Sequence, residues 1–102
     1  TITSSSDYRL KKNIKHINNT LDKIDNIHPI KYNLKNSNID YIGFIAQDFK
    51  QHFPELLKRD NPNSFYSLAY DRIPSINMAC IKELKQQILN LQKEIQLLKN
   101  QT

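Results

Sequence analysis

A serine and a lysine lie five residues apart near the start of the chain, in the stretch SSSDYRLKKNI. A serine hydroxyl attacks a carbonyl group only after a base removes its proton, and a neutral amine is one such base. Burial or neighbouring cations favour the neutral amine, and Arg9 and Lys12 are such neighbours. Ser6 and Lys11 are therefore candidates for a nucleophile and its general base. On spacing alone the alternative is stronger: Ser6 or Asp7 caps a helix and Lys11 lies in solvent.

The size and composition of the chain restrict the elements that can position such a pair. Its 102 residues suffice for one small domain with a thin core, for which association with other chains adds stability. No apolar run approaches the roughly 20 residues that span a bilayer. No apolar signal segment follows TITSSSDYRL either. We therefore expect no membrane contact by this domain.

The charge pattern and the cysteine count exclude further classes of function. Fifteen lysines and arginines outnumber ten acids, but the basic residues are scattered and do not alternate with aromatic side chains. We therefore expect no nucleic-acid binding by this domain. The chain has one cysteine, Cys80, and three histidines without metal-ligand spacing (His16, His28 and His52). We expect no metal site and no cofactor.

The first half of the chain shows one helical pattern and two strand patterns. Apolar residues spaced by three and four predict a helix that ends at His28, before Pro29: Ile14, Ile17, Leu21, Ile24 and Ile27. Residues 30–34 and 41–46 read as two strands of a hairpin, with a turn over 35–38. Gly43, the only glycine, lies inside the second strand, where a glycine often marks a bulge or a close approach by another backbone.

The segment that follows the hairpin predicts short elements. Residues 47–53 suit one or two helical turns that place Phe49 and Phe53 on one face. Residues 54–63 read as a loop, and residues 65–70 as a third short strand. Together these patterns predict an α+β fold, a small helix-plus-hairpin domain followed by a long C-terminal helix.

The last third of the chain carries a heptad repeat. Isoleucine occupies every a position and leucine every d position, with gaps of three and four: Ile81, Leu84, Ile88, Leu91, Ile95 and Leu98. This stripe favours a self-associating parallel coiled coil over a single amphipathic helix packed on its own domain, because only Leu89 and Leu97 widen it. Isoleucine at a with leucine at d favours two strands, but residues outside the coil can override that preference.

Five segments in order resemble one family of proteins. SDYRLKKNI resembles the opening signature of the intramolecular chaperone auto-processing domains. These domains lie at the C-termini of phage tail spikes and fibres, and within membrane-anchored myelin regulatory factor proteins. HPIKYNL is similar to the family's Pro-x-x-Tyr strand, GFIAQDF to its GFIAQE segment, and FPELL to its next motif. YSLAYDRIPSINMACIKELKQQILNLQKEI resembles the closing helix and coiled coil, so the likeness covers about residues 4 to 100.

The resemblance implies a function and a domain organisation. Members of the family trimerise an upstream fibre, tail spike or regulator and then release themselves by cleavage. By this likeness, residues 1–6 are a leader that contains the cleavage site, 7–73 the auto-processing domain, and 74–102 a trimerising coiled coil. The partners implied are two further copies of the chain and the upstream part of the same polypeptide. The setting implied is virion fibre assembly in a host cell or a membrane-associated precursor. The alternative is a structural trimerisation cap that does not cleave.

The resemblance also implies roles for individual residues. Ser6 corresponds to the nucleophile of a serine autoprotease and Lys11 to its general base. Six residues match motif positions that shape the site: Asp7, Arg9, Asn13, Gly43, Phe44 and Gln47. Cleavage is expected between Ser5 and Ser6, with the bond after Ser6 as the alternative. Some members also use a histidine near the second motif, and the corresponding stretch IDYIGF has none.

Overall fold

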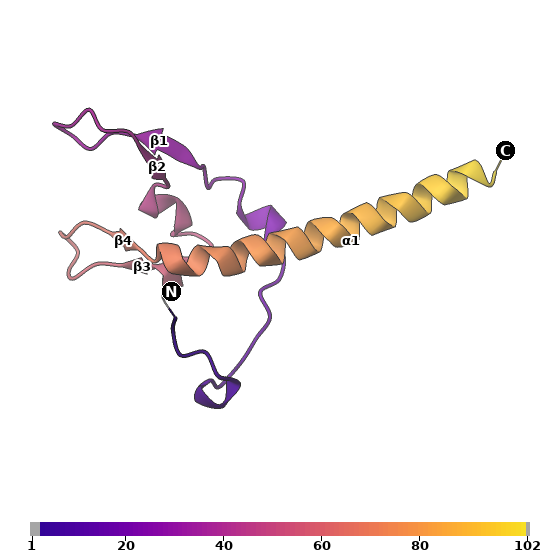
Figure 1. The fold of residues 1–102 in the computed structure, drawn as a ribbon, viewed down its shortest axis with the longest axis horizontal. Helices are drawn as coiled ribbons and strands as arrows, with labels where there is room; N and C mark the ends of the chain where they lie inside the picture. The colour runs from indigo at the N-terminus through magenta and orange to yellow at the C-terminus, as the bar shows by residue number, and fades with distance from the viewer. Residues whose placement is uncertain (1–2, 102) are drawn as a thin grey trace.

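A computed structural model describes residues 3–101 and shows an α+β fold, which confirms the predicted class (Figure 1). The strands form two antiparallel hairpins: β1 (Ile30–Tyr32) with β2 (Tyr41–Gly43), and β3 (Leu57–Lys58) with β4 (Ser67–Leu68). The α-helix is α1 (Ile73–Lys99). Short 3₁₀ helices lie between them: η1 (Tyr8–Leu10), η2 (Leu21–Lys23), η3 (Ala46–Phe49), η4 (Pro54–Leu56) and η5 (Tyr70–Arg72). Thr1, Ile2 and Thr102, which belong to the predicted leader and coiled-coil segments, lie outside the described residues.

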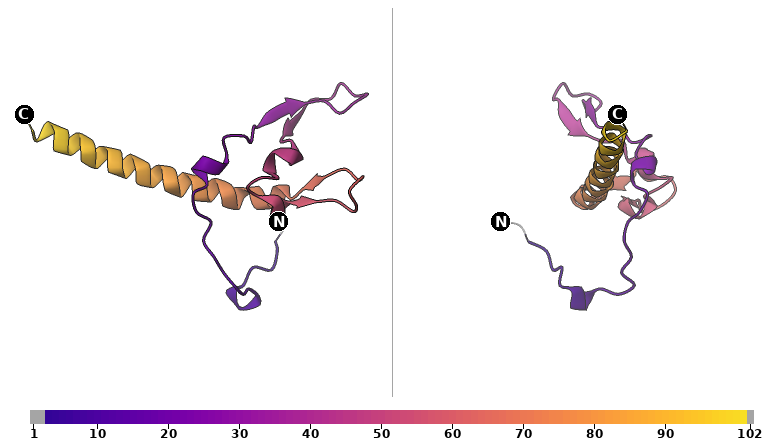
Figure 2. Two further views of the ribbon diagram at one scale, coloured as in Figure 1. Left: turned by 180° about the vertical axis from the view of Figure 1, so that it is seen from behind. Right: turned by 90° about the vertical axis from the view of Figure 1, so that its right-hand side faces the viewer.

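The 27-residue helix α1 is the longest element of the fold, and its C-terminal half projects beyond the rest of the chain (Figures 1 and 2). Pro74 is tolerated in its first turn, where a backbone N–H would have no partner within the helix. The six heptad residues are between 46% and 62% exposed, so the single chain leaves the stripe open. The coiled coil itself stays a prediction. No helix within residues 3–101 is long and apolar enough to cross a membrane.

The core lies where the first turns of α1 meet η3 and η4. Its buried residues are Phe49, Phe53, Leu56, Ile73, Ile76 and Cys80. The predicted helical turns after the hairpin thus place Phe49 and Phe53 together inside, as their spacing indicates. Leu21, Ile24 and Ile27 pack against this core from the η2 side, and Phe44 packs from the end of β2.

The helix predicted from Ile14 to His28 is wrong, because only η2 is helical in this stretch. Asn19 has a φ of 57°, which breaks any right-handed helix just before η2. Asparagine and β-branched isoleucine are also weak helix formers. Ile14 and Ile17, the first two residues of the stripe, are therefore exposed, and only its second half reaches the core.

The predicted first hairpin is confirmed, with shorter strands than expected. Ile30 pairs with Gly43, Lys31 with Ile42 and Tyr32 with Tyr41, and the two tyrosine rings stack with centroids 5.7 Å apart. The predicted third strand is observed as β4, whose partner β3 falls in the segment predicted as a loop. Strands β3 and β4 have two residues each. A strand as short as β3 shows no alternation of polar and apolar residues from which it could be predicted.

Gly43 lies in close contact with the side chain of Tyr70, so the group that approaches it is a side-chain hydroxyl and not the backbone that was predicted. A Cβ atom built on Gly43 would be 2.6 Å from the Tyr70 hydroxyl. That hydroxyl accepts a 3.0 Å hydrogen bond from the Phe44 N–H and lies 3.4 Å from the Phe44 carbonyl oxygen, to which it donates. The glycine thus lets η5 hold the end of β2.

We expect Gly43→Ala to destabilise the fold by about 1–3 kcal/mol, because the new methyl group displaces the Tyr70 hydroxyl from Phe44. Urea unfolding at fixed protein concentration measures this loss. In a Tyr70→Phe background the hydroxyl is gone, so the same change should cost clearly less. An equal cost in both backgrounds would show that the contact with Tyr70 is not the cause.

Candidate active site

The turn that carries Ser6 and Lys11 is built by an aspartate and an arginine two residues apart. The Asp7 carboxylate caps η1 by accepting a 2.9 Å hydrogen bond from the Arg9 N–H. The Arg9 guanidinium donates two more bonds to the same carboxylate, at 3.1 and 2.9 Å. Backbone bonds from Leu10 to Asp7 and from Lys11 to Tyr8 complete the turn. Asp7 and Arg9 were predicted to shape the site, which stays a prediction; in the structure they close the turn between Ser6 and Lys11.

This turn brings the two candidate catalytic side chains into contact. The Lys11 Nζ donates a hydrogen bond of 2.7 Å to the Ser6 Oγ. Both residues are exposed, as is Ser5 on the other side of the expected cleavage site. A nucleophile and a general base must lie about 2.6–3.2 Å apart for proton transfer, so the separation of the pair suits that step. The exposed position leaves both groups in contact with water.

The ion pair beside the two side chains is the main electrostatic feature of the turn. Hydrogen bonds from the Arg9 side chain, and then from its backbone, hold the pKa of the Asp7 carboxyl below its usual value. The same contact raises the pKa of Arg9. Both groups therefore keep their charges around neutral pH, so the ion pair between them can form there. Asn13 follows in the left-handed region with φ 53°, a conformation that asparagine tolerates better than most residues.

The arm that carries this turn, residues 3–19, extends away from the body of the domain (Figures 1 and 2). Its apolar side chains are open to water: Tyr8 is 78% exposed, Leu10 73% and Ile14 68%. Such a stretch is unusual for a chain that functions alone, because burial of each large apolar side chain gains about 1.5–3 kcal/mol.

The second predicted motif lies on the other side of α1 from the arm in this single chain (Figures 1 and 2). Gly43 and Phe44 form the end of β2, and Gln47 lies in η3. Within residues 3–101 none of the three forms a hydrogen bond with Ser6 or Lys11. The single chain thus brings Ser6 and Lys11 of the first motif into contact. It does not bring the second motif to them.

A contact that no sequence pattern predicted holds the end of the arm that joins the body of the domain. Thr20 is completely buried, and its hydroxyl donates a hydrogen bond to the Glu83 carboxylate on α1. The same carboxylate accepts bonds from the N–H groups of Thr20, at 2.9 Å, and Leu21, at 3.5 Å. More than 60 residues separate the partners, and no local pattern in the sequence links them. Glu83 therefore acts as the cap of η2, supplied by a distant element.

This carboxylate gives the fold a defined sensitivity to acid. The bond from the Thr20 hydroxyl lowers the pKa of Glu83 below its usual 4.5, partial burial opposes that shift, and the two N–H groups and Lys23 add to it. A carboxyl whose pKa is lower in the folded state stabilises the fold above the unfolded-state pKa. That contribution is lost as the pH falls below about 4.5 through the folded-state pKa.

We therefore expect the free energy of unfolding to decrease as the pH is lowered from 5 towards 3, roughly the window in which such a carboxyl becomes protonated. The variant Glu83→Gln should be less stable at pH 7 and lose less on acidification, because an amide does not titrate. Urea titrations across this range measure the difference. A parallel decline in both proteins would assign the acid sensitivity to other carboxyl groups.

Within residues 3–101 no hydrogen bond joins a histidine side chain to Ser6 or Lys11. His16 and His52 face a shared cleft beside Lys23, Glu55 and Arg72. The described residues 3–101 contain no group of three or more His, Cys, Asp or Glu side chains suited to a metal ion.

Comparison with known families identifies the domain. Residues 6–58 match the family described as chaperone of endosialidase, which carries a peptidase name. The chain belongs to this family. The match starts at Ser6 and ends at Lys58, so it includes the η1 turn, the first hairpin and η3.

The family match confirms the resemblance to an intramolecular chaperone auto-processing domain. The chaperone of endosialidase match covers both motifs that were quoted for the site, SDYRLKKN and GFIAQDF. It does not reach α1 or β4. Neither a curated protein nor a solved structure matches the chain.

Proposed function

We propose that this chain trimerises an upstream fibre, tail spike or regulator protein as an intramolecular chaperone, and releases itself by autoproteolysis next to Ser6. The observation that carries the proposal is the 2.7 Å hydrogen bond between the Lys11 Nζ and the Ser6 Oγ. The pair lies in the segment that belongs to a family with a peptidase name. The turn closed by Asp7 and Arg9 supports it further, because this turn holds the pair together before any partner binds.

The proposed chemistry needs only residues of this arm and one water molecule. Neutral Lys11 takes the proton from the Ser6 hydroxyl, and the Oγ attacks the carbonyl carbon of Ser5 through a five-membered ring. The Ser5–Ser6 amide bond breaks, and the nitrogen of Ser6 receives the proton from Lys11. An ester now joins the Ser5 carbonyl to the Ser6 Oγ. Water hydrolyses this ester, which leaves a carboxylate on Ser5 and a free hydroxyl and amine on Ser6.

The exposure of the pair explains why cleavage would follow assembly. In the single chain the Lys11 amine donates its hydrogen bond to the Ser6 hydroxyl, and both groups are exposed. Burial disfavours the charged form of an amine. Neighbouring copies that cover the arm would therefore switch Lys11 from donor to base. The exposed apolar residues Tyr8, Leu10 and Ile14 give those copies a surface to cover.

Intact mass of the protein, with the sequence that naturally precedes this chain, tests the proposal. We expect the parent to lose everything before Ser6, and Ser6→Ala and Lys11→Ala to stay intact. Ser5→Ala is the matched control and should still be cut, because it keeps both catalytic groups. A new N-terminus at Asp7 would move the cut to the bond after Ser6. A trimeric parent that stays uncut would make the domain a structural cap, and cleavage of Ser6→Ala would exclude Ser6 as nucleophile.

A further inference from the structure

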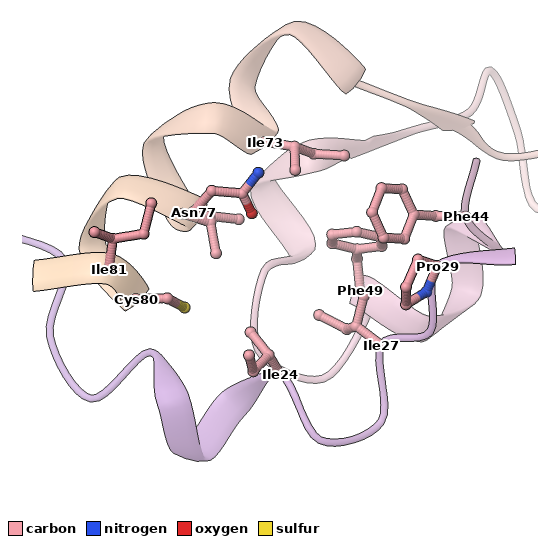
Figure 3. A pocket seen from close by; sticks show the side chains of 10 residues that line it. Ile24, Ile27, Pro29, Phe44, Phe49, Ile73, Asn77, Cys80 and Ile81 are labelled. Atoms are coloured by element: carbon pink, nitrogen blue, oxygen red, sulfur yellow. The ribbon is translucent and has the colours of Figure 1, made fainter. Parts of the chain in front are cut away.

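An apolar groove lies between the first turns of α1 and the body of the domain (Figure 3). Its volume is about 460 Å³. Phe44 and Phe49 form part of one wall, Ile24 and Ile27 line it from the η2 side, and α1 contributes Asn77 and Ile81. Asn77 is the one amide among the lining side chains. A single domain rarely leaves an apolar groove of this kind open to water without a ligand or partner.

The groove is continuous with the heptad stripe. Asn77 precedes Ile81 by four residues and Leu84 by seven, so it occupies the d position of one earlier heptad. A second hollow runs along α1 beside Ile81, Leu84 and Ile88, and it shares Ile81 with the groove. One apolar trough therefore runs from the groove along the a and d face of the helix.

The arm of the same chain does not fill this trough. Residues 16–18 pass α1 beside Ala79, Lys82 and Gln86. At 3.6 residues per turn these positions lie about half a turn from Asn77, Ile81 and Leu84. The chain crosses α1 at the Thr20–Glu83 contact and leaves on the opposite face (Figures 1 and 2). The described residues thus leave the trough open to a further segment or a second molecule.

We propose that α1 of a second copy of this chain occupies the trough, including its groove end, and that Asn77 sets the register of the assembled copies. This inference rests on the proposed trimer and names the surface that forms it. The occupant follows from the stripe itself, because isoleucine at a and leucine at d form a seam with an identical stripe. The seam therefore starts one heptad before Ile81, inside the globular part of the domain.

Asn77 suits the role of a register residue. Its side chain has no hydrogen-bond partner within residues 3–101. A neighbouring helix in the groove would take this amide out of water, where an unpaired polar group destabilises the contact. An amide both donates and accepts, so Asn77 side chains of adjacent copies satisfy one another only when the helices are parallel and in register. Any shifted register would place the amide against isoleucine or leucine.

The groove also gives assembly a direct route to the second motif. A helix in the groove touches Phe44 and Phe49, whose rings pack edge to face with centroids 5.5 Å apart. The backbone of Phe44 is held in turn by the Tyr70 hydroxyl. The matched motif GFIAQDF therefore contributes a wall of the contact between copies.

Disulfide trapping in a Cys80→Ala background tests the proposal. Cysteines at facing d positions fall within the 4.4–6.8 Å Cα separation that a disulfide accepts. We expect Asn77→Cys and Leu91→Cys to cross-link on oxidation, and Gln86→Cys, on the opposite face, to stay reduced. Cross-linking at position 91 but not at 77 would leave the coiled coil intact and overturn the groove contact. Failure at both positions would contradict the proposed assembly itself.

A second experiment isolates the register role of Asn77. In the variant Asn77→Leu the helices still associate, but we expect the cross-link yield of Leu91→Cys to fall at least about twofold, because shifted registers become populated. Asn90→Leu makes the same change away from the stripe and should leave the yield unchanged. An unchanged yield in Asn77→Leu would overturn the register role.

Discussion

The double variant Ile88→Asp/Leu91→Asp is expected to be monomeric and to lose self-cleavage. The two side chains are 53% and 56% exposed in the single chain, at the middle of the stripe. Burial of an isoleucine or leucine contributes about 1.5–3 kcal/mol, and the proposed trimer would lose three copies of each. The aspartates add buried like charges at the seam, which a coiled coil does not tolerate. The arm that carries Ser6 and Lys11 is itself untouched by these changes.

Light scattering for the oligomeric state and intact mass for cleavage measure the two effects on one sample. The matched control is Gln86→Asp/Asn90→Asp, which adds the same charges on the opposite face of α1 and should leave assembly and cleavage intact. The control removes one exposed hydrogen bond, between Gln86 and Asn90. A monomer that still cleaves would refute the coupling between assembly and chemistry, whereas an uncleaved trimer of the double variant would refute the role of the stripe.

Patterns within short stretches of sequence predicted much of the fold. The alternation in residues 30–34, the turn residues after it and the apolar run at 41–46 specified the first hairpin. The heptad residues specified a long helix, which begins at Ile73. The lone glycine in a strand, Gly43, indicated a bulge or a close approach by another backbone, and the structure shows a close approach by the Tyr70 side chain instead. Each of these signals depends on residues within a few positions of one another.

The parts that could not be predicted depend on distant partners. The isoleucine stripe from Ile14 has helical spacing, but Asn19 turns left-handed and Thr20 binds Glu83. No local pattern shows that a carboxylate 63 residues later will cap η2. Strand β3 exists only because β4 pairs with it across a loop. Tertiary contacts thus override local propensity at these places.

The candidate site also has a part that depends on local sequence and a part that depends on distant contacts. Ser6 and Lys11 meet through a turn built wholly from residues 7–11, so their contact is a local property of the sequence. The second motif is held against Tyr70 and α1 and lies apart from that turn in the single chain. If both motifs serve one site, they meet only in an assembly of several chains. The patterns of a single sequence do not specify the contacts between chains.

Replacement of Lys11 by arginine is expected to reduce cleavage by about 10²- to 10⁴-fold without loss of assembly. Arginine keeps the positive charge and can still donate a hydrogen bond to Ser6. Its guanidinium does not lose a proton in the accessible pH range, so it cannot act as the base. This change distinguishes a catalytic role of the Ser6–Lys11 pair from a purely structural one, because a structural hydrogen bond would survive the replacement. Cleavage is followed by intact mass at neutral pH, beside light scattering on the same sample.

Chemical restoration of the amine provides the control for this variant. In a Cys80→Ala background, Lys11→Cys should be inactive, and its alkylation with 2-bromoethylamine should restore cleavage by returning a primary amine to the position. Alkylation with iodoacetamide attaches a neutral amide instead and should restore nothing. Undiminished cleavage by Lys11→Arg would exclude Lys11 as the general base. Ser6 would then require another base, and the cleft that contains His16 and His52 would be the first place to seek it.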